Sequence, residues 1–200
     1  LRASAAVAET APPPVPPLSV FLHAQTAADR IPDSLVELFD GAPDASATRL
    51  LVSDLDHVVK PNPNQSPKTF GHPVSVWLER LRNGTYRIFD TFGGGGPFPF
   101  DPSAPTRQGE MISWSISDID ASGGGNPEFV DGLVSDDVKA VRVITASGAV
   151  VDAVLANNAF LAWAPTPTDG VAQVERILVD GTVVKDGFNQ LVPSAENPLP

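Results

Sequence analysis

The sequence predicts an all-β protein, an antiparallel β-sandwich of the immunoglobulin-like or jelly-roll-like kind with one short helix. From residue 138 to residue 185, short runs of β-branched and aromatic residues alternate with turns of two or three residues. The 21 prolines and 16 glycines among 200 residues suit many short strands rather than long helices. Such a ladder of antiparallel connections must bury one face against another layer.

Three turn signals divide this C-terminal ladder into hairpins. Asp180-Gly181 stands between two apolar runs and predicts a type I′ turn, which requires positive φ at both central residues. Asn157-Asn158 predicts the same turn, because asparagine tolerates the left-handed region. Ser147-Gly148 predicts the third turn.

The N-terminal 18 residues are expected to lie outside the folded domain. Alanine gives way there to a proline cluster, which favours extended polyproline II geometry in an arm or linker. The segment is either a stiff spacer or an arm that orders against a partner chain. We expect the partner contacts at Pro12, Pro13 and Pro14.

One β-sandwich domain is expected from residue 19 to residue 187, followed by a Pro-rich tail at 188–200. Residues 19–30 are expected to begin as a short strand. Residues 31–41 predict the one short helix, because Pro32 suits its first turn and Gly41 its end.

Strand patterns follow at residues 48–59, 74–81, 85–92 and 111–119. Asn83-Gly84 predicts a hairpin turn between the second and third of these strands. In that hairpin one face of the strands is expected to carry Trp77, Glu79 and Arg87. The opposite face is expected to carry Val76, Leu78, Tyr86 and Ile88.

The composition excludes several classes of function. The 13 basic and 24 acidic residues give a net charge of -11, which argues against binding to nucleic acid or to anionic lipid. Because there is no cysteine, disulfides and thiolate metal sites are excluded. No run approaches the roughly 20 apolar residues that a membrane span needs. Because the chain begins at Leu1, we expect a processed or truncated product.

A resemblance covers about half of the chain. The residues that carry it are Gly132, Leu133, Val134, Asp136, Val138, Asn158, Phe160, Asp180 and Gly181. They resemble the C-terminal β-sandwich module of secreted or membrane-anchored actinobacterial proteins of unknown function. The resemblance implies an extracytoplasmic, secreted or cell-surface, all-β domain and carries no catalytic residue across. The insertion at residues 93–110 departs from the pattern.

Asp54, Asp56 and His57 are the first candidate site. In a regular strand the two carboxylates share one face and His57 lies on the other. They are either a solvated strand face or a carboxylate pair that holds a cation or acts as acid and base. No GxSxG motif is present, so a hydrolase would need residues that converge only in space.

The second candidate is a calcium loop formed by Asp118, Asp120, Ser122 and Glu128, in which oxygen ligands alternate before a glycine. The alternative is a flexible acidic loop, and no other cofactor is expected. The third candidate is a set of phenylalanines, Phe92, Phe98 and Phe100, in a Gly/Pro-rich loop. They either fold back over the open end of the sandwich or contact another chain.

These observations favour a non-enzymatic, extracytoplasmic structural or protein-interaction module, a subunit of a larger surface assembly. Its partner is expected to be a protein or a second copy of the chain. The alternatives are a small hydrolase that uses His57, Asp54 and Asp56, and a viral decoration or fibre protein.

Overall fold

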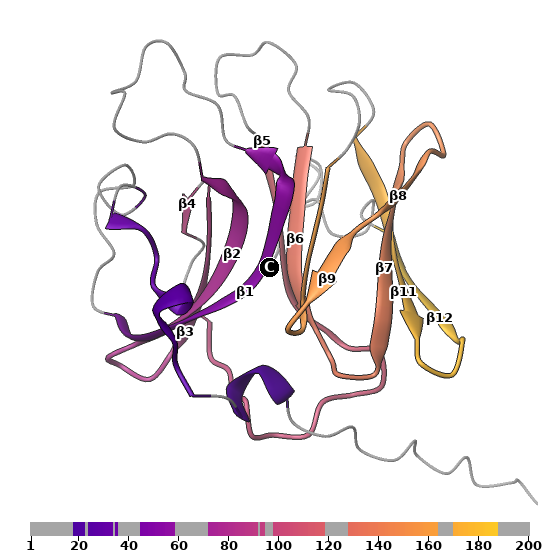
Figure 1. Ribbon diagram of the computed structural model, residues 1–200. Helices are drawn as coiled ribbons and strands as arrows, with labels where there is room; N and C mark the ends of the chain where they lie inside the picture. The colour runs from indigo at the N-terminus through magenta and orange to yellow at the C-terminus, as the bar shows by residue number, and fades with distance from the viewer. Residues whose placement is uncertain are drawn as a thin grey trace, which may run out of the picture.

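The computed structural model is described over most of the chain. The described residues are 18–22, 24–33, 35, 45–58, 72–91, 93–94, 98–118, 128–163 and 170–187. Their strands form three antiparallel sheets (Figure 1). The all-β, antiparallel architecture predicted from the sequence is therefore confirmed, with three sheets where two were expected.

Each sheet has four strands, and neighbours in the following order are hydrogen-bonded to each other. The N-terminal sheet contains β1 (Ala45–Val58), β2 (Pro73–Leu81), β3 (Tyr86–Asp90) and β4 (Gly93–Gly94). The middle sheet contains β5 (Met111–Asp118), β6 (Glu128–Val134), β10 (Ala159–Trp163) and β9 (Val154–Ala156). The C-terminal sheet contains β12 (Val183–Gly187), β11 (Val171–Leu178), β7 (Val138–Thr145) and β8 (Val150–Asp152).

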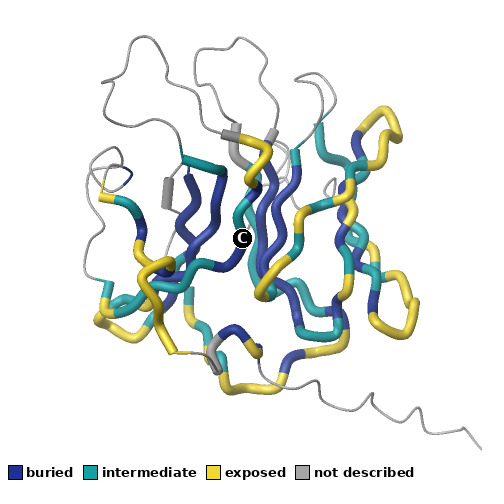
Figure 2. The backbone as a smooth tube through the Cα atoms, in the orientation of Figure 1, coloured by how far each residue is buried: buried dark blue, intermediate teal, exposed yellow. Residues whose placement is uncertain are grey.

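The middle sheet is buried on both faces. Phe129 and Leu133 of β6 pack against the N-terminal sheet, in a cluster with side chains of β1, β2 and β3. Val130 and Val134 of the same strand pack against the C-terminal sheet, in a cluster with side chains of β7 and β11. Alternate residues of a strand point to opposite faces, so β6 serves both clusters. Figure 2 shows this concentration of buried residues in the middle of the stack.

One strand segment joins two of the layers. Residues 150–152 pair with β7 in the C-terminal sheet, and residues 154–156 pair with β10 in the middle sheet. Ala153 lies between these two halves, and its amide still donates to the carbonyl of Val141 at 2.9 Å. The chain therefore passes from one sheet to the next without a loop.

Three hairpins use the same turn. Gly84, Gly148 and Gly181 have φ of 86°, 86° and 90°, and each donates its amide to the carbonyl three residues earlier. This geometry is a type I turn followed by a left-handed glycine, which forms a bulge. The type I′ turn predicted at Asp180-Gly181 is wrong, because Asp180 is not among the residues with positive φ. The hairpin itself and its register, Ile177 opposite Val183, are present.

The type I′ turn occurs at Asn157-Asn158, as predicted. Their φ values of 47° and 67° are the only positive ones among the described residues other than glycine. Side-chain hydrogen bonds stabilise this geometry: Asn157 Nδ2 donates to the carbonyl of Leu51 at 2.8 Å, and Asn158 Nδ2 to that of Val134 at 3.2 Å.

The N-terminal segment contains short 3₁₀ helices rather than the expected strand. They span Ser19–Leu22 (η1) and Ala27–Asp29 (η2). Leu18, which the sequence placed in the arm, is buried in the cluster between the first two sheets. Of the expected helix at 31–41, Asp33 and Leu35 are helical, and most of the rest lies outside the described residues.

The outer face of the N-terminal sheet is covered. Ile31 and Leu35 pack on Trp77 and Phe89, with Leu50 at the margin. Trp77 lies opposite Phe89 in the β2–β3 register, as the predicted alternation requires. This covering separates the outer face of β2 and β3 from solvent.

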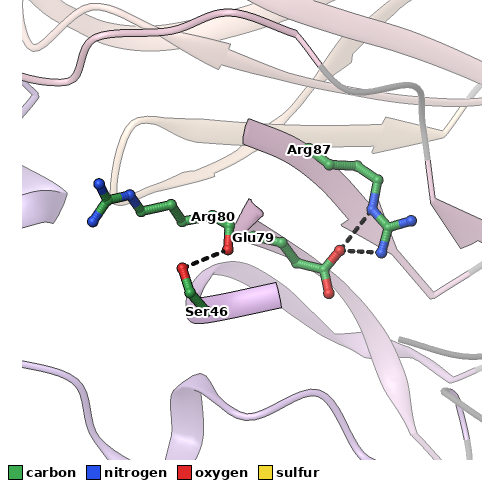
Figure 3. A network of polar contacts seen from close by, with 4 residues as sticks. All are labelled: Ser46, Glu79, Arg80 and Arg87. Carbon is green, nitrogen blue, oxygen red and sulfur yellow. Dashed lines mark hydrogen bonds and ion pairs between the residues drawn. The ribbon is translucent and has the colours of Figure 1, made fainter. Parts of the chain in front are cut away.

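The same face carries a buried ion pair (Figure 3). Arg87 Nε donates to Glu79 Oε2 at 2.6 Å, and Nη2 donates to the same oxygen. The Glu79 side chain has no exposed surface, and Arg87 is 14% exposed. Nearby, Ser46 Oγ donates to the carbonyl of Arg80 at 3.0 Å and secures the start of β1. The charges of Glu79 and Arg87 therefore neutralise each other within the fold.

No helix among the described residues is long and apolar enough to span a membrane.

Gly132, in the middle of β6, provides a test of the packing. A Cβ atom there would stand 2.6 Å from both Phe160 Cε1 and the carbonyl oxygen of Ser113. We therefore expect Gly132→Ala to lower the free energy of unfolding by about 3 kcal/mol through overpacking. Gly187→Ala is the matched control, because nothing lies within 4 Å of a Cβ atom at that position. Equal effects of the two changes in chemical denaturation would contradict the packing described.

Candidate functional site

His57, near the end of β1, is contacted by a carboxylate of its own strand and by a tryptophan of the middle sheet. His57 Nδ1 lies 2.6 Å from Asp54 Oδ2. The imidazole stacks on the indole of Trp163, with ring centroids 4.9 Å apart. Trp163 in turn contacts Phe129 at 5.2 Å. The side chain of His57 is therefore oriented by a carboxylate on one side and an aromatic ring on the other.

This arrangement corrects the strand geometry expected from the sequence. Regular alternation puts Asp54 and Asp56 on one face and His57 on the other. The β1–β2 register shifts between Asp54 and Val58, so the strand is irregular there. Asp54 is 7% exposed and bonded to His57, whereas Asp56 is exposed. The two carboxylates therefore do not form a pair.

The Asp54–His57 pair has the geometry of a histidine held for proton transfer. A carboxylate bonded to Nδ1 fixes the ring and leaves Nε2 for another group. The side chain of His57 is 53% exposed, so part of the ring faces solvent. Within the described part of the chain, no hydroxyl group is hydrogen-bonded to this ring. The pair provides an orienting acid and a base without a described nucleophile.

A second acidic group lies deeper between the N-terminal and middle sheets. Asp131 of β6 has no exposed surface, and Asp90 of β3 is 6% exposed. Ser115 donates its hydroxyl to Asp131 Oδ1, while Asp131 Oδ2 is buried without a hydrogen-bond partner. Burial, together with the charge of Asp90, raises the pKa of Asp131 to about 7, although the Ser115 hydrogen bond opposes this shift.

The sequence pattern around Asp131 indicates that this aspartate is buried, although it was not among the predicted site residues. In the run from Phe129 to Leu133, Asp131 occupies the middle position of a period-two pattern whose other members are apolar. An aspartate on the apolar face of a strand must be buried. Its neighbour Asp90 comes from a different sheet, so no sequence spacing connects the two.

The predicted calcium loop connects β5 to β6. Asp118 and Glu128 are register partners at the ends of these two strands. Asp120 and Ser122 lie outside the described residues, as do the side chains of Asp118 and Glu128. Among the side chains that are described, no group of three histidine, aspartate or glutamate residues could hold a metal ion. Calcium binding at this loop stays a prediction.

Two of the three predicted phenylalanines pack on the protein itself. Phe98 and Phe100 are partly buried against the cluster between the first two sheets. Phe98 exchanges backbone hydrogen bonds with Tyr86, and the ring of Phe100 contacts the Tyr86 ring edge-on at 5.4 Å. They therefore pack in part on the sandwich, and a contact of Phe98 or Phe100 with another chain stays a prediction. Phe92 and Pro12, Pro13 and Pro14 lie outside the residues with described side chains, and their partner contacts stay a prediction.

A polar hollow of about 300 Å³ lies where η1 meets the turns after β6 and β9. Its carboxylate, Asp136, already accepts hydrogen bonds from the amide of Ser19 and from Asn158 Nδ2. The hydrogen bond from Ser19 to Asp136 therefore attaches the N-terminal segment to the sandwich.

Comparison with family models, curated proteins and solved structures finds no significant match to this chain. The function is therefore inferred from the geometry described above.

Asp131 makes the stability of the protein depend on pH. Its pKa is 3.8 when unperturbed and about 7 in the fold, so between these values the folded state holds a proton that the unfolded state has lost. Stability is therefore expected to fall as pH rises through this window, at most by about 1.4 kcal/mol per pKa unit.

The measurement is urea denaturation at several pH values across the window. Asp131→Asn removes the titrating group and should flatten this dependence, while the exposed control Asp33→Asn should leave it unchanged. A wild-type protein that gains stability between the two pKa values would contradict the role assigned to Asp131.

Proposed function

We propose that this chain is a non-enzymatic, extracytoplasmic structural or protein-interaction module and a subunit of a larger surface assembly. One observation carries the proposal: among the described residues, the exposed large apolar side chains lie on edge strands of the sheets or in a turn beside one. They are Leu55 on β1, Val150 on β8, Val154 on β9, Val183 on β12 and Val179 in the β11–β12 turn, with exposures of 77%, 59%, 38%, 45% and 66%.

The location of these side chains supports protein binding. β1 and β9 are edge strands of the first two sheets, and β8 and β12 are the two edges of the third. An edge strand presents unpaired backbone donors and acceptors, to which another chain can add. Apolar side chains at such an edge add buried area to those hydrogen bonds.

Two of the described charged pairs are used within the fold. Glu79 pairs with Arg87 across β2 and β3, and Arg176 pairs with Asp186 across β11 and β12. Each pair therefore stabilises the pairing of neighbouring strands within one sheet when both partners are present. A viral decoration or fibre protein is one form that this proposal takes, and the extracytoplasmic location rests on the resemblance of the C-terminal half.

The mass of the native protein tests the proposal. We expect the full chain to be part of a complex, either with itself or with a foreign protein. The variant Leu55→Ser/Val154→Ser/Val179→Ser should stay folded, because exposed positions change stability by about 0.5 kcal/mol or less. It should associate more weakly than a control with serine at the exposed polar residues Arg82, Arg107 and Lys139. A wild-type protein that is strictly monomeric in its native setting would contradict the proposal.

A small hydrolase is the second candidate, and the Asp54–His57 hydrogen bond is the observation that favours it. If His57 acts as a base, His57→Ala should lower hydrolysis of ester or peptide substrates by about 100-fold or more. Asp54→Asn should also lower the rate, whereas Asp33→Asn, at an exposed carboxylate that pairs with Arg30, should leave it unchanged. The measurement is a panel of chromogenic substrates, and a wild-type protein without activity on any of them removes this candidate.

A further inference from the structure

One face of the C-terminal sheet carries exposed side chains and is not covered by the other described residues. Its inner face packs on the middle sheet through Val141, Val143 and Val174. The alternate residues of all four strands point away from the stack, where this sheet forms one side of the molecule (Figure 1). On that face Arg142, Asp152 and Lys185 are exposed. We call the outward-pointing residues of β12, β11, β7 and β8 the outer face.

A row of alternating charges crosses the outer face. Strand register places Lys185, Glu175, Arg142 and Asp152 side by side on β12, β11, β7 and β8. Lys185 Nζ lies 2.6 Å from Glu175 Oε1, and Arg142 Nε lies 3.0 Å from Asp152 Oδ1. The order of charge across the sheet is therefore plus, minus, plus, minus.

Mostly apolar rows lie on both sides of the charged row. On one side the register aligns Val183, Ile177 and Ala140. On the other side it aligns Gly187, Gln173, Ile144 and Val150. Val183 and Val150 are 45% and 59% exposed, and both belong to the edge side chains on which the proposed function depends.

This pattern is complementary to itself. Consider two copies whose outer faces meet, related by a two-fold axis that lies between the faces, parallel to the strands and midway between β11 and β7. The rotation places β12 of one copy over β8 of the other and β11 over β7, and each row of one copy then lies over the same row of the other. Lys185 then faces Asp152 of the second copy, and Glu175 faces Arg142 of the second copy. Ile177 faces Ala140, and Val150 faces Gly187, whose missing side chain leaves room. Two-fold interfaces require such self-complementarity, and aligned sheets pack face to face in this way.

We propose that the outer face binds the outer face of a second copy of this chain. The inference deepens the proposed function, on which it rests, by naming the partner and the surface. The contact measures about 15 Å by 15 Å from the strand spacings, which places it among small, reversible interfaces. We therefore expect a weak monomer–dimer equilibrium, in which the dimer fraction rises with protein concentration.

A charge exchange on the full chain tests the pairing between copies. Asp152→Lys places two lysines opposite each other twice per dimer and should weaken dimerisation by about tenfold or more. Asp152→Lys/Lys185→Asp restores opposite charges between copies, although it creates like charges between neighbours within each sheet. Dimerisation should therefore recover in the double variant, which intramolecular ion pairs would not explain. The measurement is sedimentation equilibrium over a wide range of concentrations.

Asp33→Lys is the matched control, because Asp33 is 75% exposed and ion-paired with an arginine, like Asp152, but lies far along the chain in the N-terminal segment. It should dimerise like the wild type. Dimerisation that is insensitive to Asp152→Lys, or that does not recover in the double variant, would place the contact elsewhere and overturn this inference, while the proposed function would stand. A monomeric wild type at all concentrations would also overturn it, and the native mass measurement would then decide whether a foreign partner exists.

Discussion

The central strands of the middle sheet, β6 and β10, have no solvent face, and the rest of the structure depends on this constraint. β6 and β10 carry apolar side chains on both sides, which join the two clusters of buried residues. The other two sheets are each needed to cover one of those faces, because uncovered apolar area is unfavourable in water. Loss of either outer sheet would leave half of β6 and β10 exposed. The three layers are therefore expected to form together.

Burial on both faces leaves little tolerance in the middle sheet. Gly132 lies against the Phe160 ring with no room for a side chain, and Asp131 next to it has no exposed surface. The two residues are adjacent in β6 and point to opposite clusters. The Phe160 ring limits position 132 to glycine, and the cost of burying a charge raises the pKa of Asp131. The same constraint thus sets both the packing limit and the pH dependence of this strand.

The two outer sheets differ in what covers their far sides. Ile31 and Leu35 cover the N-terminal sheet, where Trp77 and Phe89 would otherwise be exposed. The far side of the C-terminal sheet carries a charged row and small or β-branched residues, and Arg142, Asp152 and Lys185 of that row remain exposed. This asymmetry explains why the self-association surface inferred for this chain lies on the C-terminal sheet. The Asp54–His57 pair lies between the other two layers, where its ring is held by Trp163.

The sequence by itself determined the local structure. Glycine and asparagine marked the turns at Asn83-Gly84, Ser147-Gly148, Asn157-Asn158 and Asp180-Gly181, because few other residues adopt positive φ. Period-two patterns marked the strands and the opposite faces of the β2–β3 hairpin. Turn type at Asp180-Gly181 was mistaken, since the same dipeptide suits both a type I′ turn and a type I turn with a bulge.

The tertiary structure alone decided how the strands were divided among layers. A run such as that of β10 is apolar on both faces, and its pattern does not say which sheets will cover it. The register shift in β1 brought His57 to Asp54, against the alternation that the sequence implied. Asp90 and Asp131 came together across two sheets, as did the charges of the outer face across four strands. The neighbours Asp90 and Asp131, and likewise Arg142 and Glu175, lie on strands far apart in the chain, so local patterns contain no information about them.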